Sequence, residues 1–229
     1  MNARTWLLLM WVAVLATPST ALADETSRLQ NATEVIRALR AAPDNGIPEE
    51  LWNKAECVAV IPKMKKAAFV FGGEYGRGVM SCRNANGWSA PLFLQLAKGS
   101  WGLQIGAEEL DLVLLVMNRE GVDRLLDNKI TLGADASVAA GPVGRAANAS
   151  TDAQVTAKIL SYSRARGAFA GINLSGGVLR PDTDANAEYY GAAAPPHDVL
   201  NGKVPVKDSA ALALVQTLSR DVRATTGRR

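Results

Sequence analysis

The chain has 229 residues, enough for one mid-sized domain or two small ones. Hydrophobic residues make up 48% and charged residues 21%, a globular composition that argues against long disordered stretches. The formal net charge of +3 is too small to indicate a nucleic-acid-binding protein. The single histidine, His197, excludes a histidine-rich metal site, and the two cysteines exclude a four-cysteine zinc site.

The first 23 residues have the pattern of a secretory signal peptide. Arg4 gives a basic start, residues 6–16 are an apolar run, and residues 21–23 place small side chains where a signal peptidase reads. The apolar run is too short for a membrane span, which needs roughly twenty residues. We therefore expect cleavage before Asp24 and an exported, periplasmic or envelope protein with one mature domain over residues 24–229; an uncleaved anchor is the alternative.

The two cysteines allow two interpretations. Export would place Cys57 and Cys82 in an oxidising compartment, where disulfides persist. A bridge across these 25 positions would contribute roughly 3 kcal/mol in the chain-entropy model. The alternative is a pair of buried free thiols that act as small apolar residues. Both cysteines lie in strand-like segments that need not be neighbours, so the sequence leaves the pairing open.

Two helices are expected near the start of the mature chain. Residues 27–30 have the pattern of a capping box that opens the first helix. Its apolar face repeats at spacings of three and four, through Leu29, Ala32, Ile36 and Leu39. Turn residues at 43–46 end it, and a short second helix is expected from Pro48 to about Lys54.

The centre of the chain, from about residue 56 to 180, is rich in short apolar, strand-like segments. Expected strands cover residues 57–61, 67–71, 78–83, 88–97, 102–106, 110–117, 158–166 and 168–179. Residues 110–117 are nearly all apolar, which fits a strand covered on both faces. No long helical crossovers separate the strands, so we predict an α+β fold: a strongly curved antiparallel sheet or partial β-barrel with helices at both ends. Other expected helices are 119–127 and a last one, capped by Asp208, to about 224.

Several polar clusters are weak candidates for chemistry. The glycine-rich residues 72–78 lack the order of a phosphate-binding loop, so we predict a hairpin turn there. Asp182, Asp184 and Asn186 begin like a calcium loop, but Ala187 and Ala193 replace the required glycine and glutamate. A polar turn that caps a short helix is the better interpretation, with a looser calcium contact as the alternative.

Catalytic residues are not evident. Glu108, Glu109 and Asp111 could act as paired carboxylates but fit a solvated strand edge better. The serines lack a nucleophile elbow, and His197 follows two prolines, where an oriented base is hard to hold. We therefore expect no enzyme activity and no cofactor.

A basic cluster is the strongest candidate for binding. Lys63, Lys65 and Lys66 are expected in a short connection between two apolar strands, where lysines can reach phosphate groups as point charges. Arg77, together with Arg164 and 166, would add to the same field if the fold brings them close. The alternative is that these are ordinary solubilising lysines.

Longer stretches of the chain resemble a known family. These are residues 88–91 (Trp-Ser-Ala-Pro), the 102–106 pattern Gly-x-Gln-Ile-Gly, 112–114, the small-residue run 131–145, 161–164, 169–171 and 189–191. In this order, over about residues 29–191, they are similar to the SYLF lipid-binding domain. The resemblance implies a single domain that binds phosphoinositides or other anionic lipids, without enzyme activity.

The resemblance also sets expectations about partners and site residues. Eukaryotic SYLF proteins bind actin and often carry an added SH3 or zinc-finger domain, whereas an exported chain would more plausibly meet anionic envelope lipids. We expect lipid binding through the basic residues of the first helix, Arg37 and Arg40, together with Lys63, Lys65, Lys66 and Arg77. The alternative is an envelope scaffold protein that packs its small-residue segment 133–144 on a protein partner.

Overall fold

The computed structural model describes residues 19–42, 46–68, 71–101, 106–143, 157–165, 168–192 and 194–219. The helices are α1 (Ser19–Arg40), α2 (Glu49–Lys54), α3 (Arg119–Asp127), α5 (Thr183–Tyr190), α6 (Pro196–Leu200) and α7 (Ser209–Ser219). The strands are β1 (Cys57–Ala68), β2 (Phe71–Asn84), β3 (Gly87–Trp88), β4 (Leu92–Trp101), β5 (Gly106–Val116), β6 (Ile130–Thr131), β7 (Val138–Ala140), β8 (Ile159–Ala165), β9 (Ala168–Gly171) and β10 (Val178–Pro181).

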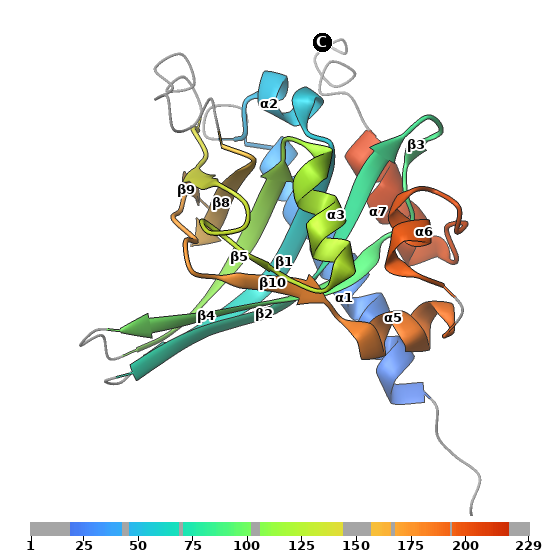
Figure 1. Ribbon diagram of the computed structural model, residues 1–229, viewed down its shortest axis with the longest axis horizontal. Helices are drawn as coiled ribbons and strands as arrows, with labels where there is room; N and C mark the ends of the chain where they lie inside the picture. Colours follow the sequence, from blue (N-terminus) through green and yellow to red (C-terminus); the bar gives the residue numbers. More distant parts are fainter. Residues whose placement is uncertain are drawn as a thin grey trace, which may run out of the picture.

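The strands form one curled sheet, a half-barrel, in the order β6-β10-β4-β2-β1-β5-β8-β7 (Figure 1). The central strands pair antiparallel, as predicted, and the α+β class is confirmed. The exception is β7, which runs parallel to β8, so the sheet is mixed rather than purely antiparallel. Parallel strands cannot be joined by a tight turn, and the 141–158 link between β7 and β8 is long enough for this pairing.

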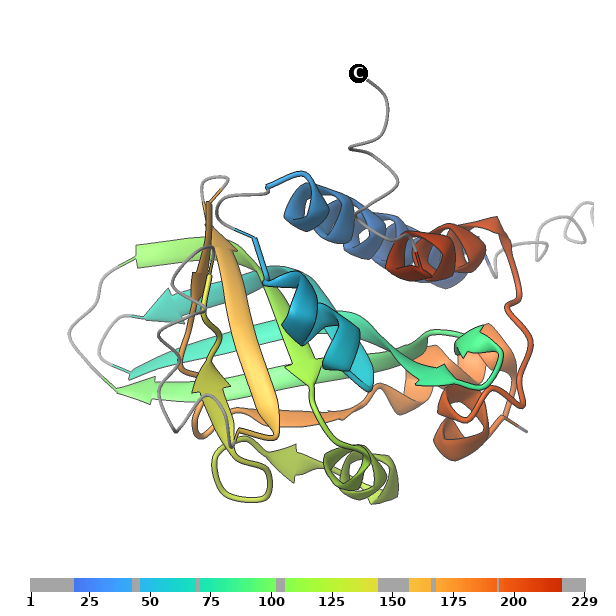
Figure 2. The ribbon, with the colours of Figure 1, turned by 90° about the horizontal axis from the view of Figure 1, so that it is seen from above.

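Helices cover both faces of the sheet (Figure 2). Along β1, Cys57, Ala59 and Ile61 point into a core closed by α3 and α6. The alternate residues Val58 and Val60 point into a second core, which α1 and α7 close. A strand buried on both faces reads as a continuous apolar run, which is why the interpretation of residues 110–117 is confirmed in β5.

One end of the sheet extends past the helices as an arm (Figures 1 and 2), in which the paired ends of β1, β2, β4 and β5 lie side by side. The predicted hairpin turn at residues 72–78 is wrong, because these glycines lie inside β2 and pair with both β1 and β4. They allow close packing instead: a Cβ at Gly76 would come within 2.3 Å of the Ile61 side chain. At Gly78 it would come within 2.2 Å of the Val60 carbonyl oxygen.

The cysteine pairing that the sequence left open is a disulfide between Cys57 and Cys82. The two residues stand directly opposite each other on β1 and β2, and both are fully buried. The bridge therefore staples the middle pair of strands from inside the core.

Several element boundaries differ from the sequence prediction. α1 begins at Ser19, so Ser27 lies within the helix, where its Oγ accepts a hydrogen bond from Asn31. The segment 168–179 is two strands, β9 and β10, because a loop that packs Leu174 into the core separates them. Asp208 does cap α7, accepting from the Ala211 N–H at 2.9 Å. The expected turn at 43–45, the expected strand at 102–105 and the helix beyond 219 lie outside the described residues.

Candidate anion-binding site

The three lysines of the basic cluster lie within β1, not in a connection between strands as predicted. β1 continues through them because its pairing with β2 and β5 shifts register around Pro62 and resumes at Met64 and Lys65. Lys63 takes up the irregularity with a φ of 51°, and its backbone N–H donates to Asp111 Oδ1 at 3.0 Å. The register shift changes which side chains face α1.

Lys65 and Lys66 point to opposite faces of the sheet, because successive side chains of a strand alternate. Lys65 stands opposite Tyr75 and Glu109, on the face that α1 covers. Lys66 stands opposite Glu74 and forms an ion pair with its carboxylate at 3.8 Å. The fold therefore separates Lys66 from the other two lysines.

A pocket of about 240 Å³ lies between the start of α1 and this part of the sheet. Its lining residues come from α1, β1 and β2 and are Asp24, Ser27, Arg28, Asn31, Pro62, Lys63, Lys65, Tyr75, Gly76 and Arg77. Four of these lining residues are lysines or arginines, and one is an acid, Asp24. Tyr75 adds a large apolar side chain that is 47% exposed. The pocket therefore combines phosphate-binding side chains with an exposed ring.

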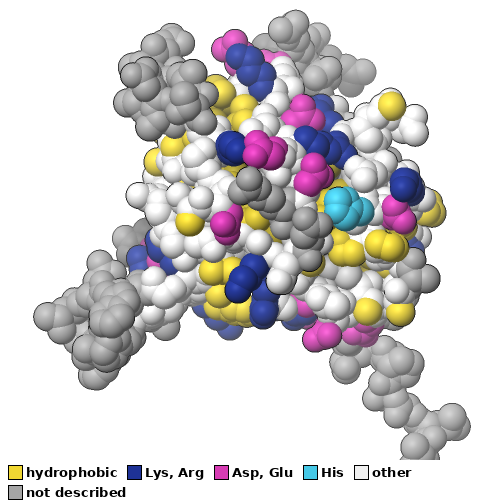
Figure 3. All heavy atoms as spheres, in the orientation of Figure 1, with side chains coloured by type: hydrophobic (Ala, Val, Ile, Leu, Met, Phe, Trp, Pro, Cys, Tyr) yellow, Lys and Arg dark blue, Asp and Glu magenta, His cyan; other side chains and the backbone are white. Residues whose placement is uncertain are grey.

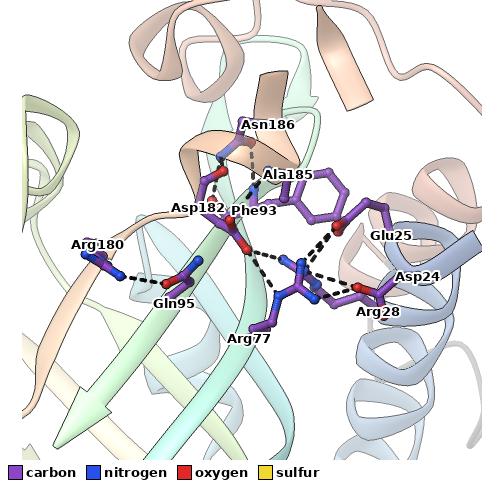
Figure 4. A network of polar contacts seen from close by, with 10 residues as sticks. All are labelled: Asp24, Glu25, Arg28, Arg77, Phe93, Gln95, Arg180, Asp182, Ala185 and Asn186. Atoms are coloured by element: carbon purple, nitrogen blue, oxygen red, sulfur yellow. Dashed lines mark hydrogen bonds and ion pairs between the residues drawn. The ribbon is translucent and has the colours of Figure 1, made fainter. Parts of the chain in front are cut away.

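Arg28 and Arg77 are held in place by a partly buried ionic network (Figure 4). Both donate to Asp182 Oδ2, Arg28 at 3.0 Å and Arg77 at 3.3 Å. Both also donate to Glu25 Oε1 at 3.1 Å. Arg77 reaches further to Asp24 at 2.5 Å. The network clamps α1 to β2 and to the start of α5, and it fixes two guanidinium groups at the pocket.

Asp182 holds the network from the sheet side. Burial alone would raise the pKa of Asp182, but hydrogen bonds from Gln95 and Arg28 lower it below its ordinary value. Its carboxylate also caps α5 by accepting from the Ala185 N–H, as the sequence predicted for this polar turn. Asn186 completes the turn, exchanging hydrogen bonds with both backbone groups of Phe93 on β4.

Glu25 carries the opposite pKa shift. Burial raises the pKa of Glu25 and outweighs the attraction of Arg28 and Arg77. Its side chain is only 2% exposed. In this network the charged form of Asp182 is thus stabilised, whereas the charge of Glu25 is only partly offset by its cationic partners.

The other basic residues of the sequence prediction lie elsewhere. Arg37 and Arg40 are at the far end of α1, where Arg40 donates to the Leu218 carbonyl oxygen and its guanidinium lies 4.6 Å from the Trp52 ring centroid. Arg164 forms an ion pair with Asp111, the residue that also accepts from Lys63. Residue 166 lies outside the described residues. Of the six proposed lipid-binding residues, the pocket gathers Lys63, Lys65 and Arg77.

Sequence reasoning missed Asp24, Arg28 and Tyr75 as pocket residues. The sequence pattern predicts Asp182 only as part of a polar turn that caps a helix. The signal that could have found the two α1 residues is the spacing of Asp24, Arg28 and Asn31 on one face of the helix. Their partners on β2 and α5 are distant in sequence, so the pairing itself depends on the tertiary fold.

Other candidates among the described residues suit an anion less well, since a second pocket of about 440 Å³ sets Arg180 beside Asp182 and Asp184. None of the clusters of His, Cys, Asp and Glu in the described residues could hold a metal ion. Glu108 and Glu109 are exposed, as expected for a strand edge. On the face that carries α3, basic and acidic side chains are interspersed (Figure 3). No helix within the described ranges is both long and apolar enough to cross a bilayer.

Comparison with known proteins identifies relatives. A family profile described as Ysc84, Las17-binding protein actin regulator, matches residues 97–221. Protein YSC84 of Saccharomyces cerevisiae is 34% identical over 171 residues, 73% of this chain and 36% of the yeast protein. The human SH3 domain-containing YSC84-like protein 1 is 30% identical over 186 residues, 78% of this chain and 54% of the human protein. The chain thus spans about a third to a half of the length of these relatives.

Proposed function

Because the chain belongs to the Ysc84 family of Las17-binding protein actin regulators, which contains the SYLF domain, we propose that it is a non-enzymatic binding module for anionic phospholipids. In this proposal the pocket beside α1 holds a phosphate-bearing headgroup at a membrane surface. The observation that carries it is the convergence of Arg28, Lys63, Lys65 and Arg77 on one pocket.

The geometry of these cations supports phosphate binding. The guanidinium groups of Arg28 and Arg77 are fixed by Glu25 and Asp182, which also offset their charge, so the arginines lose little side-chain entropy on donating to an anion while Lys63 and Lys65 add positive charge. Lys63 and Lys65 are exposed and free to follow the headgroup. Preorganised arginines beside adaptable lysines are a suitable arrangement for a phosphate diester.

The apolar side chains at the pocket support a membrane rather than a soluble anion. Tyr75 is one of two large hydrophobic side chains that stand out as exposed among the described residues. It lies on the same face of the arm as Lys65. Aromatic rings partition to the headgroup boundary of a bilayer, where one side is apolar and the other wet.

We further propose that the protein works in the cell envelope, after cleavage before Asp24. The signal-peptide pattern of residues 1–23 supports export. In this proposal the exported protein meets anionic envelope lipids such as phosphatidylglycerol and cardiolipin, and neither phosphoinositides nor actin are its partners. The proposed ligand is therefore the anionic phosphate diester that these headgroups share.

Vesicle flotation tests the function. The protein is mixed at low salt with two kinds of vesicle, one of phosphatidylcholine alone and one with about a third phosphatidylglycerol. Soluble glycerol phosphate is added as a competitor in a parallel sample. We expect the protein to bind the anionic vesicles only. Binding should be lost at about 0.5 M salt, because salt screens the attraction between the basic side chains and the lipid phosphates. Equal binding to both kinds of vesicle, or to neither, would contradict the proposal.

A matched pair of variants locates the site. Lys63→Gln with Lys65→Gln removes two pocket cations, worth about 1 kcal/mol each, so the partition coefficient falls roughly thirtyfold. Lys54→Gln with Lys203→Gln makes the same charge change at two exposed lysines away from the pocket. An equal fall in both double variants would mean that net charge, not the pocket, carries the binding.

A further inference from the structure

The ionic network at the start of the mature chain contains one more acid than base. Asp24, Glu25 and Asp182 contribute three carboxylates, and Arg28 and Arg77 contribute two guanidinium groups. Glu25 and Asp182 are 2% and 3% exposed, whereas the Asp24 side chain is 54% exposed, so water reaches Asp24 but not the two buried acids. A buried carboxylate is costly unless each of its oxygens finds a donor or a cation.

One oxygen in the network identifies where that cation is missing. Glu25 Oε1 accepts hydrogen bonds from both arginines, whereas Glu25 Oε2 is buried and has no hydrogen-bond partner in the described part of the chain. Leaving a buried carboxylate oxygen unsatisfied is costly, and native proteins supply a donor. The raised pKa of Glu25 is in line with an incompletely compensated charge.

We propose that the α-amino group released by cleavage before Asp24 is the missing cation. The inference rests on the processing proposed above. The new amino group would belong to Asp24, whose carboxylate already pairs with Arg77, and it would directly precede Glu25. A protonated amine brings three donors and one positive charge, so processing makes acids and bases in the network equal in number.

The charged groups around this amino group come from four segments. They are Asp24, Glu25 and Arg28 on α1, Arg77 on β2, Asp182 before α5, and Lys63 and Lys65 on β1 at the adjoining pocket. The two arginines are already engaged with the acids, and the lysines are exposed, so water screens their effect. The positive end of α1 disfavours a cation at this position. A rise in the pKa of the amino group therefore has to come from the buried acids.

The test uses the full-length chain, produced in an export-competent bacterium and purified from its envelope. Intact mass gives the cleavage position. The pKa of the α-amino group follows from the pH dependence of its reaction with acetic anhydride, read on the N-terminal peptide. We expect a pKa at least one unit above the ordinary value of about 8. A pKa at or below that value overturns the inference, although it leaves the lipid-binding proposal standing.

Variants separate a specific role from a general effect. Glu25→Gln removes the unpaired oxygen's charge and should return the α-amino pKa toward about 8, whereas Glu34→Gln, on the exposed side of the same helix, should not. If Glu25→Gln fails to fold, a Gly-Ser insertion after Ala23 keeps every acid and moves the amino group outward. The insertion should give an ordinary pKa and a lower thermal midpoint. The inference is overturned if the α-amino pKa of the insertion variant equals that of the wild type. It is also overturned if the wild-type chain is cleaved at a position other than before Asp24.

Discussion

The aromatic ring of Tyr162 on β8 lies directly against Gly141, and a Cβ at position 141 would come within 2.0 Å of the ring carbon Cζ. Gly141 lies just after β7, and its N–H donates to the Ser161 carbonyl oxygen at 3.0 Å. Its carbonyl oxygen in turn lies close to Gly171. This contact gives a physical reason for part of the small-residue run at 131–145, which the sequence alone could not explain.

Gly141→Ala is expected to destabilise the protein by about 3 kcal/mol, because the added methyl group overlaps a fully buried ring that cannot move aside. Chemical denaturation measures the change. Gly99→Ala is the control, since nothing lies within 4 Å of a Cβ there. A loss below about 1 kcal/mol at Gly141 would mean that the loop adjusts freely.

Removing the disulfide with Cys57→Ala and Cys82→Ala should cost roughly 3 kcal/mol, the chain-entropy value for a loop of this length. Reductant in native buffer at room temperature should leave the bridge of the folded wild type intact, as a thiol assay after quenching would show, because both sulfurs are buried. Wild-type protein refolded in reductant should match the double variant. Rapid reduction of the folded protein would contradict the buried position of the bridge.

Asp182→Asn should lower stability at pH 7 by about 2–3 kcal/mol, less than for a fully buried pair because Arg77 is 39% exposed. The folded-state pKa of Asp182 is lowered, so its stabilisation is present above the unfolded value of about 3.9 and is lost as pH falls through the folded value. The difference between variant and wild type should therefore shrink in acid. A difference that stays constant down to pH 2 would rule out this role.

The contribution of Glu25 to stability changes with pH in the opposite direction to that of Asp182. It therefore partly offsets the stability that Asp182 loses in acid. Its folded-state pKa is raised, so its contribution is most favourable below the unfolded value and declines as pH rises through the folded one. Of the two acids in the network, Asp182 is thus the one whose ionisation stabilises the fold.

Lys66→Gln should leave vesicle binding unchanged, since Lys66 lies on the opposite face of the sheet from Lys65. It should still lower stability by about 1–2 kcal/mol, because Glu74 is buried and loses its ion-pair partner. Flotation and denaturation on the same preparation separate the two effects. A fall in vesicle binding as large as that of Lys65→Gln would show that binding does not use the pocket.

The α+β class, the curled sheet and the cap at Asp208 could be read from the sequence, because apolar periodicity and capping act over a few neighbouring residues. The family resemblance likewise depends only on the order of residues. The sequence pattern could not show that residues 61–67 and 72–78 lie within strands. There the chain shows proline, lysines and glycines that usually mark turns, and only pairing with β4 and β5 keeps β1 and β2 extended.

Which basic residues lie together was decided only by the tertiary structure. One register shift around Pro62 puts Lys63 and Lys65 on the α1 side and Lys66 on the other. Arg77 meets Asp182 across 105 positions of the chain. Charge is fixed by composition, but the strength of an electrostatic contact depends on distance and burial, and both arise only when remote segments pack together.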